Sequence, residues 1–309
     1  MNIICVEPLG ISKARFEELK AHYSSMGHSF EYYMDRCEDE ATLIERMQEA
    51  EVVIISNIKL SATVLSQCPN LSYLSVAFTG LDHIDLAYCK EHGITVQNAA
   101  GYSTTAVSEL AVGMMLDLLR GITTMDGVIR EGKGRGTFLG RELRGKTVGV
   151  VGTGAIGTAT IRLLLAFGAK VIAYSRTERT EVKAMGVEYV SLSTLLQQSD
   201  IVSLHTPLTA ETRGLVGEKE LSLMKPTVLL VNTARGPVCD IPAVAAALND
   251  GRIAGAAFDV FEQEPPLPGK HPLLGAPRCL LTPHVAFATE ESFAARADIV
   301  FGHVDEWLG

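Results

Sequence analysis

Residues 147–157 read TVGVVGTGAIG, an apolar run that leads directly into three glycines. Gly152, Gly154 and Gly157 have the G-x-G-x-x-G spacing, and a helical pattern follows them. Gly152 permits a tight turn, Gly154 lets a pyrophosphate approach the backbone, and Gly157 lets helix and strand pack closely. Three glycines also occur in an ordinary tight turn, but the flanking strand and helix predict a dinucleotide-binding unit. The predicted phosphate-binding loop comprises Gly152, Thr153, Gly154, Ala155, Ile156 and Gly157.

Short apolar runs and helical patterns alternate on both sides of this unit. Nearly continuous apolar runs are typical of strands buried on both faces of a parallel sheet. A chain of 309 residues is long enough for two compact domains. The sequence therefore predicts an α/β protein with two doubly wound parallel-sheet domains. The runs lie at residues 3–6, 52–56 and 73–78 before the glycine loop, and at 171–174, 201–205, 227–233 and 253–261 after it.

Composition limits the classes of partner that we expect. A net charge of -9 disfavours binding to nucleic acid. The longest uncharged stretch, residues 60–81, contains many polar side chains, so we expect no membrane contact. The first residues lack the basic segment of a signal peptide, and we expect a cytoplasmic protein. Six widely separated cysteines predict neither a metal site nor a disulfide framework.

The end of the strand after the glycine loop bears on the choice of cofactor. An Asp or Glu about 20 residues after the glycines contacts the ribose 2′-hydroxyl of NAD, whereas an Arg suits the 2′-phosphate of NADP. Here that end carries Ser175, Arg176 and Thr177, which slightly favours NADP. Glu178 is close enough in sequence to contact a ribose instead, and Arg176 is equally compatible with a solvated turn, so NAD remains open.

Several further motifs follow in order along the chain, and together they resemble the D-isomer-specific 2-hydroxyacid dehydrogenases. The stretch 284–289, HVAFAT, is similar to the glycerate dehydrogenase or hydroxypyruvate reductase branch of that family. The resemblance covers essentially the whole chain. The motifs are TGLDHID at 79–85, NAAGY at 98–102, LRGKTVG at 143–149, NTARG at 232–236, FDVF at 258–261 with Glu264-Pro265, and TPH at 282–284.

This resemblance implies a particular division of the chain. A Rossmann NAD(P)-binding domain, residues 99–285, is inserted into a flavodoxin-like substrate domain formed by residues 1–98 and 286–309. Members of the family are usually homodimers joined through the inserted domain, which gives residues 103–140 a structural role.

The resemblance also implies three catalytic residues. Arg235 grips the substrate carboxylate and polarises the carbonyl, and its planar fork of donors suits that task. His284 is the acid/base that exchanges a proton with the substrate oxygen. Glu264 orients His284 and favours its protonated form. Besides Arg235 and His284, the implied substrate contacts are the backbone groups around Phe78, Thr79 and Gly80.

Further residues are implied to contact the cofactor. Asp259 corresponds to the family position that contacts the nicotinamide amide. Ala286 stands where many relatives carry Gly, so its methyl group narrows the pocket beside the nicotinamide. The remaining residues implied to flank the cofactor are Thr105, His205, Thr206, Pro207, Thr233 and Ala234.

The predicted function is hydride transfer between NAD(P)H and a small 2-keto or D-2-hydroxy acid, such as hydroxypyruvate, glyoxylate or a pyruvate-like acid. Two alternatives remain. A corepressor branch that senses dinucleotides resembles these enzymes, but this chain shows no disordered extension for recruiting partners. Formate or phosphite dehydrogenase is the other alternative, although the formate branch pairs its His with Gln where this chain has Glu264.

Overall fold

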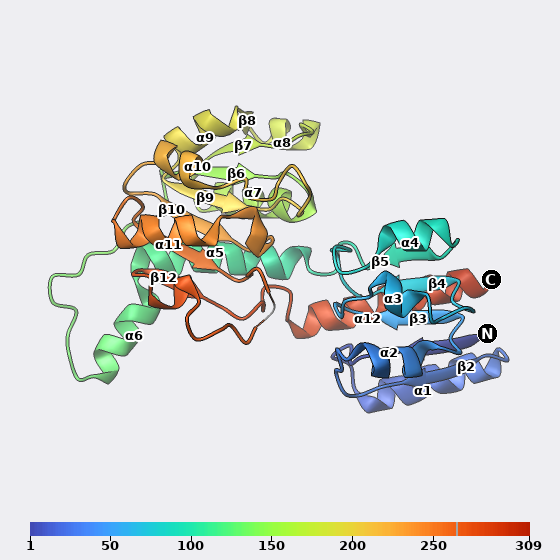
Figure 1. Cartoon of the computed structure of the whole chain (residues 1–309). Coiled ribbons are helices and arrows are strands. Elements are labelled where there is room, and N and C mark those ends of the chain that lie inside the picture. The colour runs from blue at the N-terminus through green and yellow to red at the C-terminus, as the bar shows by residue number, and fades with distance from the viewer. Residues whose placement is uncertain (264) are drawn as a thin grey trace. The chain divides into compact units, whose positions relative to one another are not determined.

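The computed structural model describes residues 1–263 and 265–309. The chain forms two compact units. Unit 1 comprises Met1–Ser103 with Ala288–Gly309, and unit 2 comprises Thr104–Phe287. Each unit is an α/β structure built on one parallel sheet, as the alternation of apolar runs and helical patterns predicts (Figure 1).

Unit 1 contains a five-stranded sheet with the order β2-β1-β3-β4-β5 and all strands parallel. This is the flavodoxin-like order, which confirms the predicted class of the unit. The elements are β1 (Asn2–Cys5), α1 (Lys13–Ser25), β2 (Ser29–Tyr32), α2 (Glu40–Met47), β3 (Val52–Ile55), α3 (Ala62–Leu65), β4 (Tyr73–Val76), α4 (Leu86–Glu91), β5 (Thr95–Asn98) and α12 (Glu290–Leu308).

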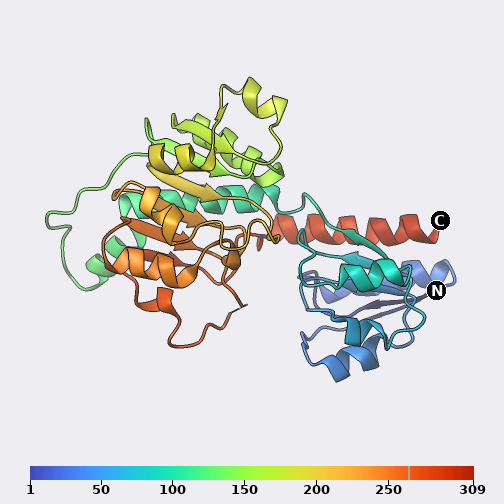
Figure 2. The same ribbon diagram turned by 45° about the horizontal axis from the view of Figure 1, so that its top comes forward.

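The C-terminal helix α12 packs on the sheet of unit 1. Thr289 caps it by accepting a hydrogen bond from the Ser292 amide. The ring of Phe301 on α12 lies near the ring of Tyr23 on α1, with centroids 6.5 Å apart, so α12 and α1 cover the same face of the sheet (Figure 2). Trp307 stacks on Tyr73 of β4 at 4.7 Å. The apolar stripe of this helix therefore binds it to the N-terminal sheet, although the whole of unit 2 separates them in sequence.

Unit 2 contains a seven-stranded parallel sheet with the order β12-β11-β10-β9-β6-β7-β8. Counted within the unit, β6 is the first strand, and the order is the 3-2-1-4-5-6 arrangement of a Rossmann fold with one added edge strand. The helices are α5 (Thr104–Arg120), α6 (Ile122–Arg130), α7 (Ala155–Ala166), α8 (Thr180–Ala184), α9 (Leu192–Gln198), α10 (Glu218–Leu223) and α11 (Ile241–Asn249). The strands are β6 (Thr147–Val151), β7 (Lys170–Tyr174), β8 (Glu188–Tyr189), β9 (Ile201–Leu204), β10 (Leu229–Asn232), β11 (Gly255–Phe258) and β12 (Cys279–Leu281), with short 3-10 turns at Gly236–Val238 and Pro272–Gly275.

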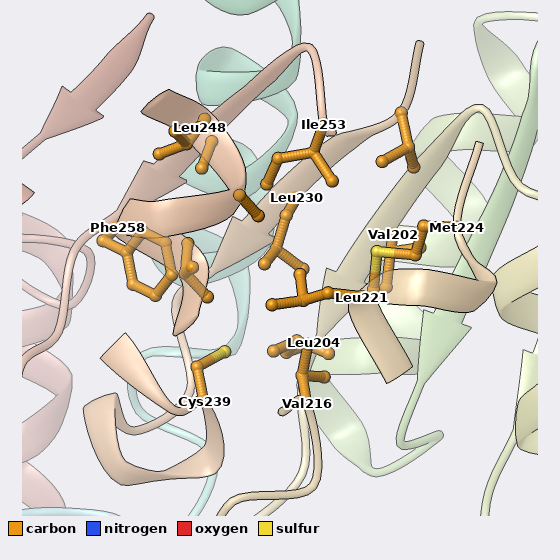
Figure 3. Packing of buried hydrophobic residues seen from close by; sticks show 14 of the residues in the cluster. Val202, Leu204, Val216, Leu221, Met224, Leu230, Cys239, Leu248, Ile253 and Phe258 are labelled. Atoms are coloured by element: carbon orange, nitrogen blue, oxygen red, sulfur yellow. The ribbon is translucent and has the colours of Figure 1, made fainter. Parts of the chain in front are cut away.

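Helices cover both faces of this sheet, and alternate strand residues point to opposite faces, so side chains on both sides are buried. Val202, Leu230 and Phe258 pack against α9, α10 and α11 on one face (Figure 3). Ile201, Val231 and Ala257 pack against α5 and α7 on the other face. The two cores fix the strand register and hence the place where each strand ends.

The sequence pattern did not predict helix α6, which has no buried residue within the chain. In both views α6 and the segment that follows it extend away from the sheet of unit 2 (Figures 1 and 2). Among the described residues, none of the helices has the length and apolar character needed to cross a membrane.

Candidate active site

The glycine loop joins β6 to α7, as its sequence predicts. Gly152 has φ +95°, and a Cβ built on it would lie 2.6 Å from the carbonyl oxygen of His205. A Cβ on Gly157 would lie 2.0 Å from the carbonyl oxygen of Gly152. The protein's own backbone therefore excludes any side chain at these two positions.

Gly154 differs from its two partners. It is the N-cap of α7, and a Cβ built on it would meet nothing within 4 Å. No side chain caps this helix, so the first amides of α7 point towards open space with the positive end of the helix dipole. An open space lined by helix-terminal amides fits the pyrophosphate of a dinucleotide.

Two buried polar atoms at neighbouring strand ends support the same conclusion. The Nδ1 atom of His205, after β9, and the Oγ1 atom of Thr233, after β10, have no hydrogen-bond partner within the described part of the chain. Buried polar atoms are usually hydrogen-bonded, so an exception needs an explanation. A bound dinucleotide would supply the partners, and the residues present therefore fit a nicotinamide cofactor.

His205 is neutral at physiological pH. Its Nε2 atom lies 2.9 Å from the Ser203 hydroxyl. Burial lowers the pKa of His205 to about 4, because burial disfavours the charged imidazolium. A neutral imidazole offers one donor and one acceptor to its surroundings.

The residues after β7 face solvent. Arg176 and Thr177 are exposed, and Ser175 is half-buried. Glu178 forms an ion pair with Lys183 at 2.5 Å. The hydrogen bond from the Thr209 hydroxyl, and to a smaller extent the charge of Arg176, lower the pKa of Glu211.

A tyrosine on β8 connects this segment to the glycine loop. The Tyr189 hydroxyl donates to Thr153 Oγ1 at 2.8 Å and accepts from the Arg179 amide at 3.0 Å. Tyr189 could not be predicted from the sequence, because β8 is only two residues long and has no strand pattern.

Arg235 follows β10 on a turn that the buried Asn232 shapes. Asn232 accepts from the Ala234 amide at 3.0 Å, and its Nδ2 donates to the Arg235 carbonyl at 2.9 Å. The half-buried Arg235 side chain donates to the Ala234 carbonyl at 2.8 Å. A Cβ on Gly236 would lie 2.1 Å from the backbone of Phe261. Glycine at this position therefore lets the chain after β11 pass directly beside the Arg235 turn.

Asp259, fully buried after β11, binds the loop that carries His284. Its Oδ1 accepts from the Thr282 hydroxyl at 2.5 Å and the Val285 amide at 2.9 Å, and its Oδ2 accepts from the Ala286 amide at 2.8 Å. Burial raises the pKa of Asp259, and these donors together with His284 oppose that shift. Three of about four acceptor positions are occupied, which leaves about one for a ligand.

His284 has φ +54°, in the left-handed region that non-glycine residues rarely occupy. Its amide donates to the carbonyls of Asp259 at 2.8 Å and Thr282 at 3.0 Å. Its ring packs edge-on against Phe287, with centroids 5.3 Å apart. The surrounding bonds hold this strained backbone in place, as is common at functional sites.

The structure brings most of these residues to one edge of the sheet. β10, β11 and β12 are parallel neighbours, so the segments that follow them meet at the carboxyl edge of the sheet, where α/β folds bind ligands. Arg235, Asp259 and His284 each follow one of these strands. Glu264, the third predicted catalytic residue, lies outside the described residues.

The other predicted positions differ in burial and in the element that carries them. Thr105 is exposed in the first turn of α5, which packs on α7. Thr206 is half-buried after β9, and the exposed Pro207 accepts from the Thr212 hydroxyl at 2.6 Å. Ala286 is buried. The part of the chain that the structure describes contains no cluster of His, Cys, Asp or Glu suited to a metal ion.

In unit 1, the predicted substrate loop follows β4. Phe78 is buried, and its carbonyl accepts from the Ala99 amide at 3.2 Å. Thr79 is exposed, and its carbonyl accepts from Asn98 Nδ2 at 2.5 Å. The amides of Thr79 and Gly80 donate to no acceptor among the described residues. A loop with free amide donors suits an anion.

Comparison with known proteins gives consistent matches. The family model described as "D-isomer specific 2-hydroxyacid dehydrogenase, NAD binding domain" matches residues 112–286. A glyoxylate reductase of Thermofilum pendens is 45% identical over 248 residues, which are 78% of this chain and 73% of that protein. A hydroxypyruvate reductase of Blautia hydrogenotrophica is 33% identical over 291 residues, which are 92% of this chain and 90% of that protein. Among solved structures, an acyclic imino acid reductase in complex with NADPH and D-Arg has a TM-score of 0.90 and 29% identity, with coverage of 100% of this chain and 97% of that chain.

Proposed function

Because the chain belongs to the D-isomer-specific 2-hydroxyacid dehydrogenases, we propose that it reduces small 2-oxo acids such as glyoxylate, hydroxypyruvate or pyruvate. As a member of this family it is an oxidoreductase that transfers a hydride between a nicotinamide cofactor and a 2-hydroxy acid. One 2-oxo acid, one reduced cofactor and one proton give the oxidised cofactor and one 2-hydroxy acid, which is the D isomer wherever C2 becomes a stereocentre.

Reduction of a 2-oxo acid requires a hydride, a proton and a group that binds the substrate carboxylate. When bound, the nicotinamide cofactor supplies the hydride that reduces C2 of the substrate. His284 donates the proton to the substrate oxygen during reduction and removes it during oxidation. Glu264 orients His284 and favours its charged form. Arg235 binds the carboxylate and polarises the carbonyl through its fork of donors.

The adjacency of β10, β11 and β12 is the observation that carries this proposal. Arg235 and His284 are 49 positions apart in the chain, yet they follow strands separated by a single strand in the sheet. Asp259, on the strand between, fixes the loop of His284 through three hydrogen bonds. A pre-organised proton donor and a guanidinium at one edge of the sheet are what hydride transfer to a keto acid needs.

We also propose that unit 2 binds the cofactor and that residues 78–80 of unit 1 bind the substrate carboxylate. The open space at Gly154 and the unpartnered atoms of His205 and Thr233 support the first assignment. The free amides of Thr79 and Gly80 support the second.

NADP is the slightly favoured cofactor in this proposal. Arg176 is exposed at the end of β7 and can contact a 2′-phosphate, whereas Glu178 is paired with Lys183. Glu211 works against this preference, since its carboxylate lies within the electrostatic reach of Arg176. NAD remains the alternative cofactor.

We propose a homodimer joined through α6 and the segment after it. Ile122, Ile129 and Leu139 are 58%, 66% and 82% exposed, and α6 buries no residue within the chain. Large exposed apolar side chains gathered on one projection are typical of an interface. A cytoplasmic location is part of the same proposal, and the six free cysteines are consistent with a reducing compartment. Neither nucleic acid nor membrane is included among the proposed partners.

The test is a panel of 2-oxo acids assayed with NADH and NADPH, together with formate oxidation. We expect reduction of glyoxylate or hydroxypyruvate, and His284→Ala should bind the cofactor normally but lose most turnover. Cofactor binding without turnover on any acid would instead indicate a dinucleotide-sensing protein. Oxidation of formate with no reduction of any 2-oxo acid would instead indicate a formate dehydrogenase.

A further inference from the structure

Arg296, on α12, is the most buried arginine of unit 1, with 3% of its surface exposed. Its guanidinium donates to the carbonyl of Leu9 at 2.6 Å, the hydroxyl of Ser56 at 3.1 Å and the carbonyl of Ala77 at 3.4 Å. These residues follow β1, β3 and β4, three neighbouring strands. One buried cation therefore connects three loops at the carboxyl edge of the substrate sheet.

Burial of the Arg296 guanidinium has two costs in stability. The Nε atom of Arg296 is buried and has no hydrogen-bond partner among the described residues. Burial also lowers the pKa of Arg296, since it disfavours the charged form. These two costs are set against its three hydrogen bonds and against the Phe293 ring, whose centroid lies 4.4 Å from the guanidinium carbon.

The buried carboxylate of Glu7 does not pair directly with Arg296. Glu7 Oε1 accepts from the Ser56, Asn57 and Ile58 amides at 2.7, 3.1 and 3.2 Å. Glu7 Oε2 accepts from Arg36 at 2.7 Å. Glu7 thus has its own full set of donors, and its charge acts on Arg296 only through space.

The link from Arg296 to the substrate loop runs through one peptide group. Arg296 reaches the carbonyl of Ala77 directly, and it also holds the Ser56 hydroxyl, which donates to the same oxygen at 3.3 Å. The carbonyl of Ala77 and the amide of Phe78 belong to one peptide unit. Donors on that carbonyl polarise the unit and strengthen its amide as a donor, because hydrogen bonds in a chain reinforce one another.

The carbonyls of the next two residues, Phe78 and Thr79, also accept hydrogen bonds within unit 1. Phe78 accepts from the Ala99 amide, and Thr79 accepts from Asn98. With three successive carbonyls bound to the protein, the amides of Thr79 and Gly80 are left for an anion. Backbone amides carry no net charge, so an anion bound to them is stabilised further by a nearby positive charge.

We propose that Arg296 is a positioning residue for substrate binding, which fixes and polarises loop 78–80 so that it selects a carboxylate. The inference rests on the proposed function, since it names the support for the carboxylate site of the same reaction. It assigns Arg296 no part in proton or hydride transfer. Its loss therefore raises the KM of the 2-oxo acid much more than it changes kcat.

The test compares Arg296→Met with Arg296→Lys and with the matched control Arg46→Met. Arg46, also in unit 1, is half-buried and donates to a backbone carbonyl, that of Val6, and its other hydrogen-bond partner is Asp35 rather than any residue of the loop. We expect Arg296→Met to raise the KM for glyoxylate about tenfold, as the loss of one charge-assisted hydrogen bond does. Lys should recover part of that loss, whereas Arg46→Met should leave KM within about twofold, as expected for a residue outside the site.

Two further measurements make the inference independent of folding and of turnover. Ser56→Ala removes only the hydroxyl between Arg296 and Ala77, and it should raise KM about two- to threefold. Hydrogen exchange of the amides of Thr79 and Gly80 should be slowed by oxalate in the wild type and in Arg46→Met, but not in Arg296→Met.

The outcomes separate the two hypotheses. An unchanged KM in Arg296→Met, or in both Arg296→Lys and Ser56→Ala should the Met variant not fold, would overturn the role of Arg296. Equal oxalate protection in all folded variants would overturn it as well. A wild-type protein that reduces no 2-oxo acid would refute the proposed function, and the exchange experiment would still decide whether Arg296 supports an anion-binding loop.

Discussion

Exchanging single glycines of the phosphate loop for alanine separates the protein's own requirements from those of its cofactor. Gly154 has φ −67° and ψ −168°, an extended backbone that alanine adopts, and its Cβ would meet nothing within 4 Å. Alanine restricts the unfolded chain, which stabilises by about 0.4–1 kcal/mol. Alanine is also a poorer N-cap than glycine by a similar amount, about 0.5–1 kcal/mol. The free energy of unfolding of Gly154→Ala should therefore change by less than about 1 kcal/mol.

Gly154→Ala should nevertheless bind the cofactor much more weakly than the wild type. The new methyl group occupies the space through which the pyrophosphate approaches the amides of α7. Losing one or two charge-assisted hydrogen bonds, each about 1.5–3 kcal/mol, raises Kd about 100-fold. Titration of NADH and NADPH by fluorescence, with thermal unfolding of the same samples, measures both quantities.

Gly157→Ala is the matched comparison. Its Cβ would lie 2.0 Å from the Gly152 carbonyl oxygen, whereas carbon–oxygen contacts are about 3.3 Å. The loop must move, and we expect a loss of about 1–3 kcal/mol of stability as well as of binding. The reasoning is refuted if Gly154→Ala binds both cofactors like the wild type, or if it unfolds as readily as Gly157→Ala.

Three other predictions concern the remaining parts of the site. Asp259→Asn places an amide group against three donors, so it should cost about 1–3 kcal/mol in urea unfolding and lower kcat at least about tenfold; wild-type kcat would contradict the positioning role. Because the pKa of folded His205 is lowered to about 4, the unfolded chain binds a proton preferentially, and stability should fall by about 1–3 kcal/mol as the pH drops from 6.5 towards 4. Urea unfolding at both pH values should show a smaller fall for His205→Gln, and an equal fall would exclude this cause. Arg176→Ala should weaken NADPH more than NADH in equilibrium titrations, and equal losses would exclude a phosphate contact.

Local pattern was sufficient to predict five of the seven strands of unit 2, namely β6, β7, β9, β10 and β11. The glycine loop and the buried strands follow from short-range rules, because backbone sterics and apolar periodicity act over a few residues. Helix α6 was not predicted, since its apolar residues are buried by nothing within the chain. In the proposed homodimer, a second copy of the chain covers these residues.

The residues that hold the site in place were harder to predict than the residues proposed to act on the substrate. Asp259 was expected at the cofactor, but its contacts with the loop of His284 depend on strand order, which no local pattern encodes. Arg296 interrupts an amphipathic helix, where an arginine is ordinarily solvated. Its three partners lie more than 200 residues away in sequence. Such residues are recognised only once the fold has brought the strand ends together.

Deuterium transfer tests the central claim most directly. Hydroxypyruvate is reduced with NADH or NADPH carrying deuterium on either face of C4, and the glycerate is analysed by mass spectrometry, NMR and chiral separation. We predict D-glycerate that carries one deuterium at C2 when the label is on one of the two faces. Glycerate without deuterium from either label, L-glycerate, or no product with both cofactors would contradict the account.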